Sequence, residues 1–248
     1  MKKLLVLVGL AGLLCAPALQ AATVTPFQNT ANYSSGNGGE FRAMPSVELN
    51  WVINNYSDLA RNALGQGGFQ TFCIETSEFF SPGTAYTATI NDRAMFGSAG
   101  SGGDPISIGT AWLYRQFASG TLSGYDYLYG NGPVTLPNNP PGEGNRVASA
   151  GLLQQAIWFL EQETGGGDNV YVALARARLG LSNAGLLADQ GGAYEYGVRA
   201  LNLTDAAGGR HQDQLVVVPE PTTVIAGALL LLPFGVSTLR ILRKKYTA

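Results

Sequence analysis

Cys73 is the side chain with the clearest potential for chemistry, because it is the only cysteine expected to remain in the mature chain. The other cysteine, Cys15, lies in an N-terminal segment with the pattern of a secretory signal. An unpaired cysteine in an exported protein points to intermolecular pairing, a reactive thiol or an unusual covalent bond. The alternative is structural, since free cysteine is among the most buried residue types.

A cysteine hydrolase is one chemistry for such a thiol. It would pair Cys73 with His211, the only histidine of the chain, and with Asp213. Catalytic cysteines are activated by a helix N-terminus or a cationic neighbour. Cys73 instead lies in a predicted strand two residues from Glu75, and a nearby negative charge raises a thiol pKa. The pattern therefore disfavours a hydrolase, and no metal-ligand spacing, phosphate loop or serine triad suggests another enzyme, a metal or a cofactor.

Hydrophobic periodicity predicts the elements that must position these residues. Strands are indicated by alternating patterns rich in aromatic and β-branched residues at 69–75, 85–92, 196–204 and 210–218, with a turn at 81–83. Helices are indicated at 108–120, 145–167 and 169–180. Strands on both sides of a helical middle predict an α+β fold, with a helical lobe inserted into a sandwich or barrel-like sheet.

The 145–167 helix places one glutamine near its buried face. The apolar stripe of this helix is formed by Leu153, Ala156, Ile157 and Leu160. At about 100° per residue, Gln154 lies about 110° from the centre of the stripe and Gln155 about 150°. Gln154 is therefore the better placed of the two to meet another element, although it is equally compatible with a solvated helix position.

The strand segment "FCIE" (72–75) followed by the helix segment "LQQAIW" (153–158) resembles the paired motifs of thioester domains in Gram-positive surface adhesins. In that family a cysteine thiol condenses with a glutamine amide to form an internal thioester. The matching positions are Cys73 and Gln154, with Trp158 beside the glutamine. The resemblance implies single-use covalent attachment to a protein amine or a sugar hydroxyl. Glu75, on the same strand face as Cys73, is a candidate for assisting a proton transfer.

The first 21 residues have the order of a secretory signal peptide. Lys2 and Lys3 precede an apolar run at 4–14, and Ala21 and Ala22 supply small residues for cleavage. Leu14, directly before Cys15, is bulkier than lipoprotein processing normally accepts. We therefore expect export through the Sec translocon and cleavage by signal peptidase.

Residues 219–248 combine three features in a fixed order. Pro219, Glu220 and Pro221 precede an uncharged apolar segment at 222–239, about long enough to span a membrane. Basic residues follow at Arg240, Arg243, Lys244 and Lys245 and place that end in the cytoplasm. The order closely resembles a PEP-CTERM sorting signal. It implies an inner-membrane anchor in a Gram-negative bacterium, recognition by an exosortase, and delivery to the cell surface or extracellular matrix.

The exported domain, residues 22–218, is acidic and lacks lysine. It contains nine arginines and 16 acidic residues, a net charge of −7, and all four lysines lie in the terminal segments. An acidic domain without a basic stripe is unsuited to nucleic acid. A domain with an acyl electrophile would gain from displaying no amines of its own, although a genomic preference for arginine has the same effect. A non-covalent protein of an exopolysaccharide or biofilm matrix remains the main alternative, because aromatic residues can stack on sugars.

Overall fold

The structure, a computed structural model, describes residues 21–28, 34–61, 67–95, 102–127, 146–188 and 195–219. In these residues helices combine with a mostly antiparallel sheet, which confirms the predicted α+β class. The signal segment and residues 220–248 lie outside the described residues. No helix within the described ranges is long and apolar enough to cross a membrane.

Six strands form the main sheet. They are β1 (Thr23–Gln28), β4 (Phe41–Pro45), β5 (Phe69–Thr71), β6 (Tyr86–Asn91), β9 (Val198–Thr204) and β10 (Arg210–Val217). Their order is β10-β9-β6-β1-β4-β5, with antiparallel neighbours throughout. Two short hairpins stand apart from this sheet: β2 (Ser34–Ser35) with β3 (Gly38–Gly39), and β7 (Arg93–Ala94) with β8 (Asp104–Pro105).

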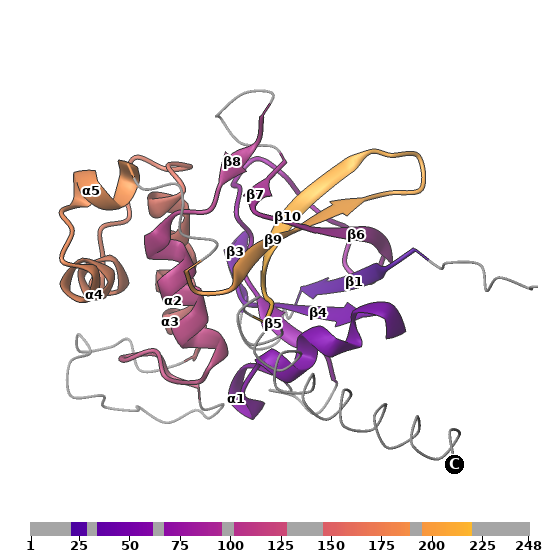
Figure 1. Ribbon diagram of the computed structural model, residues 1–248, viewed down its shortest axis with the longest axis horizontal. Coiled ribbons are helices and arrows are strands. Elements are labelled where there is room, and N and C mark those ends of the chain that lie inside the picture. Colours follow the sequence, from indigo (N-terminus) through magenta and orange to yellow (C-terminus); the bar gives the residue numbers. More distant parts are fainter. Residues whose placement is uncertain are drawn as a thin grey trace, which may run out of the picture.

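The helices are η1 (Val47–Asn55), α1 (Asp58–Arg61), α2 (Ile108–Ala118), α3 (Arg146–Leu160), α4 (Val170–Leu179) and α5 (Asn183–Ala188). Figure 1 shows α2 to α5 together on the left and the main sheet on the right. These four helices lie, in sequence, between β6 and β9, two strands that are neighbours in the sheet.

The first predicted strand, 69–75, is shorter than expected, since its ladder with β4 ends at Thr71. Beyond this point the chain meets β10 at the other edge of the sheet. The Leu215 N–H donates to the Phe72 carbonyl (3.0 Å), and the Ile74 N–H donates to the Asp213 carbonyl (3.1 Å). Cys73 faces Gln214 in an isolated antiparallel bridge. The two edges of the sheet therefore come together at Cys73.

Tyr114 of α2 lies beneath this junction. Its hydroxyl is 3.0 Å from both the Gln70 and the Leu215 carbonyl oxygens, so one buried side chain contacts β5 and β10 together. Phe72 packs edge-to-face on Phe117, with ring centroids 5.0 Å apart. Aromatic packing from α2 thus supports the meeting of the two edges.

The predicted turn at 81–83 is present, but it does not join neighbouring strands. Gly83 donates its N–H to the Pro26 carbonyl of β1, and β1 and β4 lie between β5 and β6. The sequence cannot show this, because the hydrophobic pattern of two successive strands is the same whether or not they pair.

Helix α3 ends at Leu160, earlier than predicted, since within the 145–167 segment the sequence indicates a helix that continues up to Gly165. Gln162 adopts a left-handed conformation (φ 62°), and the Glu163 N–H donates to the Trp158 carbonyl (2.8 Å). The Gln162 N–H donates to the Phe159 carbonyl, which completes a Schellman motif. This motif is normally formed by glycine, so the glycine-rich run at 165–167 indicated the stop too late.

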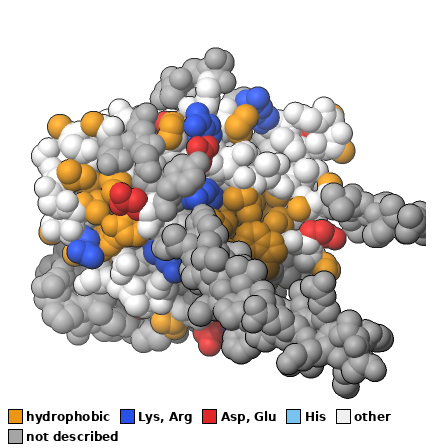
Figure 2. Space-filling view, in the orientation of Figure 1, with side chains coloured by type: hydrophobic (Ala, Val, Ile, Leu, Met, Phe, Trp, Pro, Cys, Tyr) orange, Lys and Arg blue, Asp and Glu red, His pale blue; other side chains and the backbone are white. Residues whose placement is uncertain are grey.

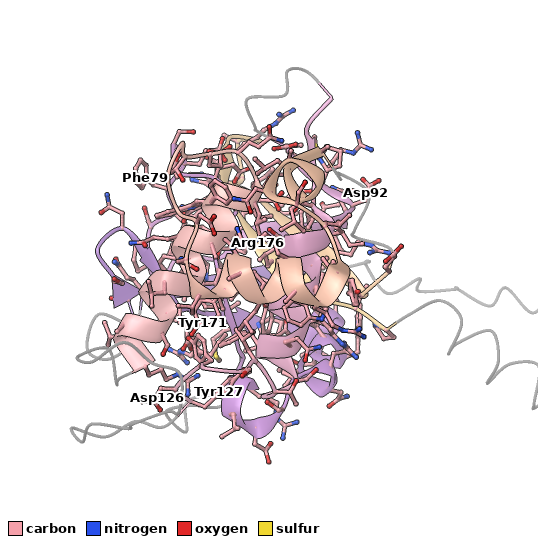
Figure 3. The ribbon with its side chains drawn as sticks, turned by 90° about the vertical axis from the view of Figure 1, so that its left-hand side faces the viewer. Phe79, Asp92, Asp126, Tyr127, Tyr171 and Arg176 are labelled. Carbon is pink, nitrogen blue, oxygen red and sulfur yellow. The ribbon has the colours of Figure 1, made fainter. Side chains whose placement is uncertain are left out.

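A buried ion pair anchors the N-terminus of α3. Arg146 donates to both carboxylate oxygens of Glu40 (2.7 and 2.9 Å), and both side chains are almost fully buried. The Tyr125 hydroxyl also donates to Glu40. The Tyr125 ring in turn contacts those of Tyr127 and Tyr171, two residues labelled in Figure 3. Glu40 directly follows β3, so the ion pair also anchors the β2–β3 hairpin.

Candidate functional site

Cys73 has backbone groups that the sheet does not use. Its neighbours Phe72 and Ile74 bond to β10, and in an antiparallel pair of this kind the N–H and C=O of the residue between them point the other way. The β4 ladder, which would meet them, starts at Phe41 opposite Thr71. Cys73 therefore needs another hydrogen-bonding partner, because buried backbone polar groups are rarely left unpaired.

Gln154 of α3 supplies that partner. Its Nε2 donates to the Cys73 carbonyl (2.8 Å), and its Oε1 accepts from the Cys73 N–H (3.3 Å). The carboxamide thus continues the ladder beyond β4 as a strand would. The sequence predicted that Gln154 meets another element, and the structure places it against Cys73.

The same carboxamide lies against the sulfur. Cys73 Sγ is 3.2 Å from Gln154 Oε1, in the geometry of a thiol donating to the amide oxygen. Cys73 is 0% exposed and Gln154 1% exposed, so bulk water does not reach either group. Two residues that are 81 positions apart in the chain are thus in direct side-chain contact in a dry environment.

The β2–β3 hairpin covers this pair. A side chain at Gly38 would place its Cβ 2.5 Å from Gln154 Cγ and 2.8 Å from Trp158 Cη2. One helical turn earlier, a side chain at Gly151 would lie 2.6 Å from Ser35 Oγ. Glycines on both elements thus allow the hairpin to lie directly on α3. We did not predict this cover from the sequence, although the turn residues in "SSGNGG" (34–39) are typical of a two-residue hairpin.

Glu163 joins the end of α3 to the chain after Cys73. Its Oε2 accepts from both the N–H and the hydroxyl of Thr76, each at 3.1 Å. The Schellman motif at Gln162 brings Glu163 to this position. The sequence analysis did not identify Glu163, because its role depends on where α3 ends.

The thiol of Cys73 is held in its neutral form. Burial raises its pKa far above the ordinary value, and the Glu75 carboxyl raises it further whenever that group is ionised. The Trp158 side chain lowers the pKa by acting as a hydrogen-bond donor to the ionised sulfur, although its buried Nε1 makes no hydrogen bond of ordinary geometry with the thiol or with any other acceptor among the described residues. The environment therefore suits a neutral thiol or a sulfur that carries no proton because it is covalently bonded.

Glu75 belongs to a buried acidic cluster beside Cys73. Burial raises the pKa of Glu75 well above its ordinary range, and the charges of Asp213 and Glu78 raise it further. Its Oε2 accepts from the Asp213 N–H (3.3 Å), whereas Oε1 is buried with no partner among the described residues. Glu75 is consequently protonated at neutral pH and is suited to donate a proton.

Two further acids have raised pKa values. Burial, followed by the charge of Asp213, raises the pKa of Glu78 to about 7. Burial raises the pKa of Glu161 to about 7 despite hydrogen bonds to its carboxyl. Glu161 Oε1 accepts from the N–H and the hydroxyl of Ser107, the N-cap residue of α2. Within the described residues, no group of three or more acidic, His and Cys side chains is arranged to hold a metal ion.

His211 lies in a different environment from Cys73. Its Nδ1 is 3.3 Å from the Phe79 carbonyl, its Nε2 is 3.3 Å from Asp205, and its ring packs on Tyr86. Asp213 instead accepts from the Met95 N–H and from Asn202. The three residues of the hydrolase alternative are therefore not assembled as a catalytic group.

Of the sorting-signal residues, the structure describes only Pro219, which is exposed just after β10. Glu220 and Pro221, the apolar segment and the four basic residues lie outside the described residues. On the face in Figure 2, basic side chains are scattered among other groups.

Comparison of the chain with protein-family models, with curated proteins and with solved structures finds no match in any of the three.

Proposed function

We propose that this protein is an exported, exosortase-sorted surface or matrix protein that carries an internal thioester between Cys73 and Gln154. The observation that supports the bond best is the 3.2 Å contact between Cys73 Sγ and Gln154 Oε1 in a fully buried site. Such positioning removes most of the entropic cost of bringing the two groups together. The meeting of the β5 and β10 edges supports a barrel-like description of the sheet around the site.

The chemistry of bond formation balances within this site. The sulfur of Cys73 attacks the Gln154 Cδ, the C–N bond breaks, and the thiol proton leaves with the amide nitrogen as ammonia. The Cys73 N–H, 3.3 Å from Oε1, can stabilise the charge that develops on this oxygen during the attack. Protonated Glu75 can donate a proton to the departing nitrogen and recover one from the thiol.

Bond formation also has a cost, which the site must offset. When the amide nitrogen leaves, the Cys73 carbonyl loses the donor that now lies 2.8 Å away. A buried acceptor left without a partner costs about 1–3 kcal/mol. The two hydrogen bonds between the Cys73 backbone and the Gln154 carboxamide favour a second candidate function. In this candidate, the protein is a non-covalent matrix protein and Gln154 only completes the sheet at Cys73.

The intact mass of the full-length chain separates the two candidates. We expect wild-type protein to be lighter by one ammonia and the Cys73→Ala variant to have its full mass. Methylamine should open the bond in wild type, adding its own mass and releasing a thiol. A wild-type protein of full mass with a free thiol would instead support the non-covalent candidate.

Two controls make this measurement specific. Asn37–Gly38 and Asn131–Gly132 can also lose ammonia by forming a succinimide, so an Asn37→Ser variant and peptide mapping are needed. Resistance of the folded protein to alkylation is not diagnostic, because Cys73 is buried whether or not it is bonded.

The proposed biological role needs a separate test. Wild type and Cys73→Ala should be compared for attachment to exopolysaccharide matrix or surface protein that survives boiling in detergent. Attachment of wild type alone would support covalent linkage to an amine or hydroxyl, and equal detergent-sensitive retention would support the matrix candidate.

A further inference from the structure

Trp158 presents an unused hydrogen-bond donor at the candidate site. Its Nε1 is buried and has no acceptor among the described residues. A buried donor without a partner costs about 1–3 kcal/mol, so its presence calls for an explanation. Unsatisfied groups of this kind are concentrated at functional sites, where another state of the molecule supplies the partner.

The ring of Trp158 lies beside the glutamine of the Cys73–Gln154 pair. Trp158 lies one helical turn after Gln154, and both side chains touch the same glycine: Gly38 would place a Cβ 3.3 Å from Trp158 Cζ2 and 2.5 Å from Gln154 Cγ. Cζ2 is on the pyrrole-nitrogen side of the indole. The Trp158 side chain also lowers the pKa of Cys73, opposing burial. The contacts thus place the ring beside Gln154, which itself touches Cys73 Sγ, and the influence on the Cys73 pKa associates the indole N–H with the thiol.

We propose that Trp158 Nε1–H is the hydrogen-bond donor that stabilises negative charge on Cys73 sulfur when the thioester is made and opened. This inference rests on the proposed thioester. In the opening step the nucleophile bonds to Gln154 Cδ, the C–S bond breaks, and its electron pair remains on sulfur. The proton lost by the nucleophile then passes to that sulfur. A neutral thiol or thioester sulfur is a weak acceptor, whereas the departing thiolate is a strong one.

The unpaired state of Nε1 is therefore what gives the donor its effect. An interaction accelerates a reaction only if it is stronger in the transition state than in the ground state. The donor has no acceptor among the described residues in the resting site and gains one as charge develops on sulfur. It acts where burial otherwise makes a thiolate costly.

The test compares Trp158→Phe with Trp112→Phe in the full-length chain. Both substitutions remove an indole N–H and retain an aromatic ring, but Trp112 belongs to α2 and is not part of the site. Thioester-containing protein is treated with methylamine, and the opening rate is followed by intact mass. We expect Trp158→Phe to open roughly 10- to 100-fold more slowly, the effect of one hydrogen bond to a charged group. Trp112→Phe should open at the wild-type rate.

The outcomes separate this inference from the proposed function. A wild-type protein that never loses ammonia removes both. A wild-type protein that carries the bond, with Trp158→Phe opening at the same rate or faster, overturns only the role of Trp158. A lower melting temperature in Trp158→Phe with an unchanged rate shows a purely structural role and also overturns it.

A second measurement uses the wild-type sequence, in case Trp158→Phe does not fold. The protein is produced with fluorotryptophan in place of tryptophan, which keeps every ring and makes the indole N–H a stronger donor to a developing negative charge. We expect methylamine to open the thioester several-fold faster in the fluorinated protein than in the ordinary protein, and by the same factor in a Trp112→Phe background. An opening rate that fluorination leaves unchanged overturns the proposal.

Discussion

The two ends of α3 carry buried polar side chains of opposite character. At the N-terminal end, Arg146 donates to both oxygens of Glu40 and to the Tyr127 and Leu59 carbonyls. Opposite charges meet there, and the hydrogen-bonding capacity of the guanidinium is used. At the C-terminal end, Trp158 of α3 and Glu161, the residue directly after the helix, each have a buried polar atom without a partner among the described residues.

This difference indicates a division of roles along one helix. A paired and hydrogen-bonded buried charge can fix the position of an element, because removing one partner leaves the other uncompensated. Raised pKa values and unpaired polar atoms are instead enriched at sites that perform chemistry. We infer that the Arg146 end holds α3 in place so that Gln154 meets Cys73 at a defined distance.

The largest expected effect comes from breaking the paired end. Arg146→Met should destabilise the protein by about 3–5 kcal/mol, because it leaves the buried Glu40 carboxylate without its counter-ion. Chemical denaturation measures this change. Arg176→Met is the matched control, since the Arg176–Asp168 pair is partly exposed to solvent and should contribute only about 0–1 kcal/mol to stability. Similar losses in the two variants would contradict the proposed anchoring role.

The next largest effect is a pH dependence of folding stability, which we expect from Glu161 at the C-terminal end of α3. Burial raises the pKa of Glu161 to about 7, so the folded protein binds a proton that the unfolded chain releases near pH 4.5. Protonated Glu161 therefore stabilises the folded state by about 3 kcal/mol. This stabilisation is fully present below pH 4.5 and is lost as the pH rises through 7. Denaturation at pH 5 and pH 8 should therefore show lower stability at the higher pH.

Glu161→Gln tests which residue causes this pH dependence. Glutamine can still accept from Ser107 but does not titrate, so the difference between pH 5 and pH 8 should shrink. Because Glu75 and Glu78 also have raised pKa values, part of the slope should persist. An unchanged slope in Glu161→Gln would show that Glu161 is ionised throughout this range.

A smaller structural effect, with a large chemical consequence, is expected at the hairpin cover. Gly38→Ala would bring a methyl group 2.5 Å from Gln154 Cγ, which must shift the carboxamide or lift the hairpin. Overpacking of this kind costs about 1–3 kcal/mol. We expect loss of the ammonia-deficient mass species, measured as for wild type. Gly165→Ala is the control, because a side chain there has no neighbour within 4 Å. A normal thioester yield in Gly38→Ala would show that the hairpin does not position Gln154.

The sequence predicted the segments that hold Cys73 and Gln154 better than it predicted the contacts around these two residues. The extended segment that leads from β5 to Cys73 and the α3 position of Gln154 follow from local periodicity, which depends only on nearby residues. The junction between β5 and β10, the Gly38 cover and the Glu163 contact depend on long-range pairing and on a left-handed glutamine that ends α3. The buried Glu40–Arg146 pair has no local signal either, because isolated charged residues normally indicate exposed positions.

The smallest effect is expected at His211, and it tests the remaining enzymatic alternative. His211 contacts Phe79, Asp205 and Tyr86, whereas Cys73 contacts Gln154. His211→Ala should therefore leave the ammonia-deficient mass unchanged and alter stability by no more than about 1 kcal/mol. If Cys73 and His211 acted as a catalytic pair, His211→Ala and Cys73→Ala would instead abolish the same activity. Cys73 contacts α3, whereas His211 contacts Asp205 in the turn before β10. We therefore expect Cys73→Ala to lose the ammonia-deficient mass and His211→Ala to keep it.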